Sequence, residues 1–99
     1  MLKFVLTYRT PIGYRPGGPD VMAAWTEWFQ NIQSDLVDFG NPVFERTALG
    51  KTGDNTNLGG YSIVSADDLE AATAIARGCP ALNEGGGVEI GLLTELDRS

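Results

Sequence analysis

The segment from Leu58 to Leu93 constrains the fold of this chain more than any other part of the sequence. It holds a β-prone run at 58–65, an alanine-rich run, and a second β-prone run at about 87–94. Gly78 and Pro80 follow the alanine-rich run, and this order is typical of a helix C-terminus. The segment therefore predicts a strand, a helix and a strand.

The helix of this segment has three possible N-caps, namely Ser65, Asp67 and Asp68. Ser65 with Asp68, and Asp67 with Glu70, both have the spacing of a capping box. The apolar stripe of the helix consists mostly of small side chains, which predicts that it lies close to the sheet. A carboxylate metal site at these acids is the less favoured interpretation, because helix capping explains them.

The N-terminal half predicts a strand, a helix and a second strand. Residues 2–8 alternate and predict a central strand. A helix is expected to begin at the N-cap Asp20 and to end near 38–39, with a second strand at 42–49 and a polar turn before the third strand. The order βαββαβ predicts an α+β, ferredoxin-like fold, with one four-stranded antiparallel sheet and both helices on one face.

Bulk composition indicates a single domain over residues 1–99 and excludes several kinds of partner. The net charge is −6, and residues 52–99 hold only two of the seven basic side chains, so nucleic-acid binding is not expected. No apolar run reaches the ~20 residues of a membrane span. The N-terminus does not resemble a secretory signal, and the single cysteine is typical of a cytoplasmic protein.

The sheet face opposite the helices lacks a cover in this arrangement. Val5 and Thr7 keep the second face of the first strand fairly apolar. A domain of this size buries a modest core, so burial by association would stabilise it. The simplest cover is a second copy, which predicts a two-fold homodimer through the open sheet face.

The loop at 9–19 is long and rich in glycine and proline, and such loops are often functional. Two tryptophans lie three residues apart in the following helix. Aromatic side chains could line a pocket between the sheet and this helix, with arginines available for an acidic group. The alternative is a filled core with surface arginines. The candidate ligand-binding residues are Tyr8, Arg9, Tyr14, Arg15, Trp25, Trp28 and Tyr61.

Other motifs favour ordinary structural interpretations. The run Gly50-Lys51-Thr52 lacks the earlier glycine of a phosphate-binding loop and precedes a strand. The glycines at 85–87 are more typical of a turn into a strand than of an anion site, because Glu84 and Glu89 flank them. No histidine is present to activate Cys79 or to bind a metal, so a buried thiol is favoured. No cofactor motif is found, and any chemistry would be cofactor-free.

The chain resembles the YCII-related, or DGPF-domain, family. The resemblance rests on four segments in the C-terminal half, at 58–64, 67–72, 79–80 and 85–90, and it implies a dimeric α+β barrel. Members thought to be catalytic resemble one another in a histidine near the first helix and an aspartate before a proline. This sequence has no histidine and has Cys79 before Pro80, and the Asp-Gly-Pro-Phe motif is absent. Catalytic residues therefore cannot be assigned from the resemblance.

Two functional hypotheses follow from these observations. The preferred one is a small homodimer that binds an aromatic or acidic small molecule between the sheet and the first helix. The other is an assembly or regulatory module without a ligand, whose open sheet face serves only to pair chains.

Overall fold

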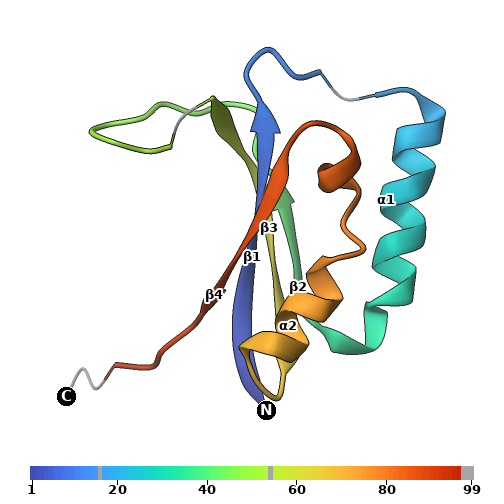
Figure 1. Ribbon diagram of the computed structural model, residues 1–99, viewed down its shortest axis with the longest axis vertical. Helices are drawn as coiled ribbons and strands as arrows, with labels where there is room; N and C mark the ends of the chain where they lie inside the picture. The colour runs from blue at the N-terminus through green and yellow to red at the C-terminus, as the bar shows by residue number, and fades with distance from the viewer. Residues whose placement is uncertain (16, 54, 97–99) are drawn as a thin grey trace.

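A computed structural model, which describes residues 1–15, 17–53 and 55–96, shows a four-stranded antiparallel sheet in the order β2-β3-β1-β4 (Figure 1). The predicted ferredoxin-like order is confirmed. The elements are β1 (Leu2–Pro11), α1 (Pro19–Asn31), β2 (Leu36–Pro42), β3 (Thr56–Ala66), α2 (Leu69–Ala76) and β4 (Gly87–Leu92), with short 3-10 helices η1 (Gln33–Asp35) and η2 (Pro80–Asn83).

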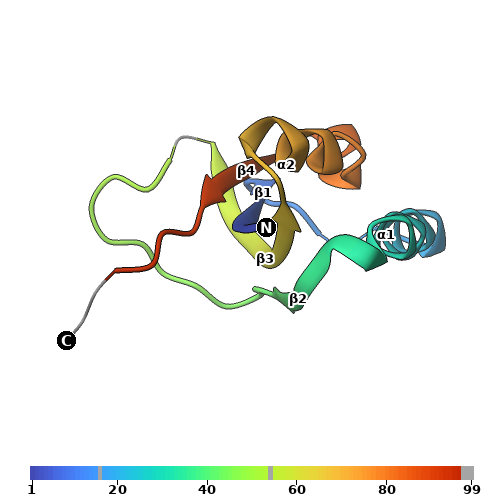
Figure 2. The same cartoon turned by 90° about the horizontal axis from the view of Figure 1, so that it is seen from below.

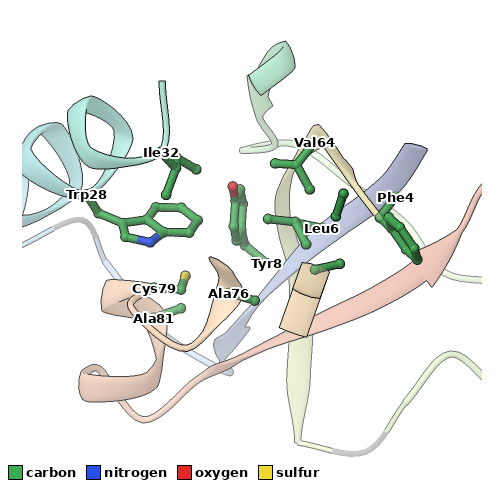
Figure 3. Packing of buried hydrophobic residues seen from close by; sticks show 11 residues of the cluster. Phe4, Leu6, Tyr8, Trp28, Ile32, Val64, Ala76, Cys79 and Ala81 are labelled. Carbon is green, nitrogen blue, oxygen red and sulfur yellow. The ribbon is translucent and has the colours of Figure 1, made fainter. Parts of the chain in front are cut away.

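The core lies between one face of the sheet and the two helices (Figure 3). Every second residue along β1 points to this face and is buried there, and the neighbouring strand β3 buries alternate residues in the same way. The helix α2 contributes alanines, and its small residues allow close approach to the sheet. The buried apolar residues are Phe4, Leu6, Tyr8, Trp28, Ile32, Val64, Ala66, Ala72, Ala76, Cys79 and Ala81.

The predicted boundary between the first helix and the second strand is wrong. The helix α1 ends at Asn31 rather than near 38–39, and the strand occupies Leu36–Pro42 rather than 42–49. The apolar residues after α1 continue a helical spacing, but pairing with β3 overrides this local pattern. Gly40 lies inside the strand instead of ending the helix.

The N-cap residue of α1 differs from the prediction, and that of α2 agrees with one of the three candidates. The N-cap of α1 is Gly18, with Pro19 at its start, so Asp20 lies in the first turn and is not the cap. A proline is favoured there because its missing N–H would be unpaired in any case. The cap of α2 is Asp68, one of the three expected candidates, and its carboxylate accepts the Ala71 N–H at 2.8 Å.

The opposite face of the sheet is not covered by either helix. Residues 43–53, which follow β2, extend away from the sheet on the side opposite α1 (Figures 1 and 2). Two of their apolar side chains are largely exposed, Phe44 at 75% and Leu49 at 89%. No helix of the described residues is long and apolar enough to cross a membrane.

Gly40 provides a test of the β2–β3 contact. Its φ is +79°, and a Cβ at this position would collide with the Tyr61 carbonyl oxygen. Gly13 has nearly the same φ, +82°, but a Cβ there would meet open space. We expect Gly40→Ala to lower the free energy of unfolding by about 1–3 kcal/mol more than Gly13→Ala, measured by urea denaturation. If both variants lost the same free energy of unfolding, the positive φ of the glycine, and not the contact with Tyr61, would explain the destabilisation.

Candidate functional site

A cleft of about 330 Å³ lies between α1 and the sheet at the C-terminal end of β1. Ligand sites commonly have volumes of about 300–1,000 Å³, so this cleft is of a size for a one- or two-ring molecule. Most of its walls are apolar or aromatic. Its lining residues include Tyr8, Tyr14, Val21, Trp25, Phe29, Phe39 and Glu84.

The aromatic wall of the cleft is centred on Tyr8. The centroid of its ring lies 5.1 Å from that of Trp25 and 6.4 Å from that of Phe29, both nearly edge to face. Phe29 in turn packs against Phe39 of β2 at 4.5 Å. Such aromatic contacts add to the stability gained by burial and fix the distance between α1 and the sheet. The cleft is thus bounded by packed rings.

The hydroxyl of Tyr8 joins three strands below the cleft. It donates to the Ser62 Oγ of β3 at 2.8 Å, and Ser62 donates to the Phe39 carbonyl of β2 at 2.6 Å. Burial raises the pKa of Tyr8 above its ordinary value, since the apolar surroundings disfavour the phenolate. Tyr8 is therefore a neutral hydrogen-bond donor held in place at neutral pH.

Glu84 is an acidic residue of the cleft that sequence reasoning did not single out as a site residue. It follows η2, and its backbone N–H donates to the Ala81 carbonyl at 3.1 Å. The Tyr14 hydroxyl donates to its Oε1 at 2.6 Å, and the indole N–H of Trp25 donates to its Oε2 at 3.1 Å. Burial, together with this hydrogen bond and the charge of Glu84, raises the pKa of Tyr14 to about 12. Tyr14 is thereby tied to the residue that follows η2.

The sequence offered one signal for Glu84, namely an acid between a helix-ending Cys-Pro and a run of glycines. That pattern could equally describe an exposed turn. The role of Glu84 depends on contacts with Tyr14 and Trp25, which lie 70 and 59 residues away in the chain. Only the tertiary structure brings them together.

The structure places the two candidate arginines differently. Arg9 borders the cleft but follows the buried Tyr8 in β1, so its side chain lies on the opposite sheet face. Its Nη2 donates to the Thr52 carbonyl at 3.1 Å, and its Nε donates to the Thr56 Oγ1 at 3.2 Å. Arg15 is exposed and does not line the cleft.

The side chains of the candidates Trp28 and Tyr61 do not form the wall of the cleft. Trp28 is buried in the core, where its indole N–H donates to the Ile75 carbonyl at 3.4 Å, and it does not line the cleft. Tyr61 borders the cleft but alternates with the buried Ser62, so its ring lies on the open sheet face. The structure thus brings the side chains of Tyr8, Tyr14 and Trp25 together around the cleft.

Cys79 lies in the core beside the cleft at 1% exposure. Burial raises the pKa of its thiol to about 11, and the charge of Glu84 adds to this shift. The thiol is therefore protonated at neutral pH and is a weak nucleophile. Within residues 1–15, 17–53 and 55–96, no group of three or more His, Cys, Asp or Glu side chains is placed to hold a metal ion.

The raised pKa values predict a loss of stability in alkali. On unfolding, the pKa of Cys79 falls from about 11 to its ordinary 9.0, and the pKa of Tyr14 falls from about 12 to its ordinary 10.0. The unfolded chain then binds fewer protons than the native protein, so the free energy of unfolding falls between about pH 9 and pH 12. Chemical denaturation across this range measures the fall. Tyr14→Phe should make the free energy of unfolding fall less steeply above about pH 10. A pH profile parallel to that of the original protein would contradict the contribution assigned to Tyr14.

Comparison with known proteins gives a family and a fold. The family model described as the YCII-related domain matches residues 4–95. No curated protein matches the chain. A solved structure, 5-chloro-2-hydroxyhydroquinone dehydrochlorinase from Burkholderia phenoliruptrix in complex with 2,5-dihydroxybenzoquinone, is 19% identical, with a TM-score of 0.58 over 93% of this chain and 94% of that one. At this identity the likeness shows the fold alone.

Proposed function

Because this chain belongs to the YCII-related domain family, we propose that it binds a small aromatic molecule in the cleft between the sheet and α1. The observation that carries the proposal is the 330 Å³ cleft itself, with its walls of aromatic rings. A single planar ring can stack on or meet the edges of such rings. The dehydrochlorinase of similar fold was solved with a one-ring quinone, and this supports a ligand of that size.

The proposal stops at binding and assigns no reaction. The sequence has no histidine, and Cys79 precedes Pro80 where the family resemblance implies an aspartate. The phenol of Tyr8 and the thiol of Cys79 both have raised pKa values, so neither supplies a nucleophile at neutral pH. A catalytic pair of the kind implied by the resemblance is therefore not part of the proposal.

Filling the cleft should weaken binding of the ligand without unfolding the protein. Val21 lines the cleft from α1, whereas Ala24 is exposed on the same helix and does not line it. We expect Val21→Phe to weaken binding of 2-phenylethanol or a related one-ring probe by about tenfold or more, and Ala24→Phe to leave it unchanged. Quenching of tryptophan fluorescence measures binding, because Trp25 lies in the cleft wall. Binding that survives Val21→Phe unchanged would place the ligand elsewhere.

We also propose that the protein is a homodimer formed through the open sheet face. Val5 and Ile63 are paired neighbours on that face and remain only partly buried in one chain. The largely exposed Leu49, between β2 and β3, adds apolar surface that a second chain could bury. This arrangement agrees with the α+β barrel implied by the family resemblance.

Light scattering tests the dimer directly. We expect twice the mass of one chain at micromolar concentration, and a monomer there would refute the proposal. Ile63→Arg should convert the dimer to monomer, because it places a charge in an apolar interface. Thr26→Arg, on the exposed side of α1, should leave the mass unchanged. A dimer that binds no small molecule would favour the alternative of an assembly module.

A further inference from the structure

The charge inside the cleft is negative. Two charged residues are found among the described residues that line it, Arg9 and Glu84. The guanidinium of Arg9 is directed to the opposite sheet face, where Thr52 and Thr56 accept its hydrogen bonds. The carboxylate of Glu84 is instead bonded to two residues of the cleft wall, Tyr14 and Trp25.

The carboxylate of Glu84 is held rigidly but is not saturated. Tyr14 donates to one oxygen and Trp25 to the other, which fixes the plane of the group. Each carboxylate oxygen can accept about two hydrogen bonds, so each retains room for another donor. A ligand group with N–H donors and a positive charge would complete this shell with a charge-assisted hydrogen bond.

The aromatic walls favour the same kind of ligand. Tyr8, Trp25 and Phe29 are packed mainly edge to face, so their ring planes differ in direction around the cleft. The face of an aromatic ring carries partial negative charge and attracts ammonium groups, most strongly when water is excluded. The net charge of −6 also raises the local concentration of cations around the protein.

We propose that the cleft selects an aromatic amine in its cationic form, with the ring against Tyr8 and Trp25 and the ammonium group on Glu84. The proposal rests on the function proposed above and names the ligand class for the same cleft. It reverses the preference for acidic ligands that the arginines of the sequence suggested. An aromatic acid would bring a second negative charge close to Glu84, with the Arg9 side chain on the far side of the sheet.

A matched series of three probes tests the selection. Phenethylamine, 2-phenylethanol and 3-phenylpropanoate share one ring and a similar length, and at neutral pH they are cationic, neutral and anionic. We expect the amine to bind about tenfold tighter than the alcohol, and the acid to bind weaker than the alcohol. Calorimetry and tryptophan fluorescence at low salt provide the dissociation constants.

Two variants test whether the preference for the amine depends on Glu84 itself or on the net charge of the protein. Glu84→Gln keeps the shape of the side chain and should reduce the preference for the amine over the alcohol to within about twofold. Glu27→Gln removes the same charge from an exposed position of α1 that does not line the cleft, and should leave the preference intact. Circular dichroism confirms that both variants fold. The ranking of the three probes on the unaltered protein is independent of either variant.

The outcomes distinguish this inference from the binding proposal. If the acid binds as tightly as the amine, or if Glu84→Gln keeps the full preference for the amine, the inference is overturned while the cleft remains the ligand site. If none of the three probes binds at millimolar concentration, both proposals are overturned.

Discussion

The packing of Tyr8 is the interaction on which the rest of the structure depends. Its ring lies on a central strand and meets the aromatic side chains of α1, while its hydroxyl reaches Ser62 and, through it, the backbone of β2. One side chain thus joins two layers and three strands. A ring of this size also holds α1 at a distance from the sheet, and the cleft is the space that remains.

The alternation of a β-strand decides the charge of this cleft. Tyr8 and Arg9 are neighbours in β1, so a side chain that packs under α1 is followed by one that faces away from it. The positive charge is therefore directed to the open side of the sheet, where backbone and hydroxyl oxygens accept its hydrogen bonds. The negative charge of Glu84 comes from the residue directly after η2, where no such alternation applies.

Family membership and site chemistry are separate properties of this chain. The YCII-related match and the ferredoxin-like topology describe how the backbone is arranged. The chemistry of the cleft depends on individual side chains, and here the histidine implied by the resemblance is missing while a carboxylate is held by a tyrosine and a tryptophan. One fold can carry different sites, so the ligand of this cleft depends on Glu84 and the rings that surround it.

The sequence alone determined the order of elements, because alternation in β1 and β3 and the capping residues before α2 are local patterns that tertiary contacts reinforce. It did not determine where α1 ends, since the residues of β2 have helical spacing and become a strand only by pairing with β3. Nor could it place Glu84, whose partners lie far away in the chain. Local periodicity favours a helix or a strand and pairing decides where each one ends, whereas a site built from distant segments exists only once the sheet and helices have packed.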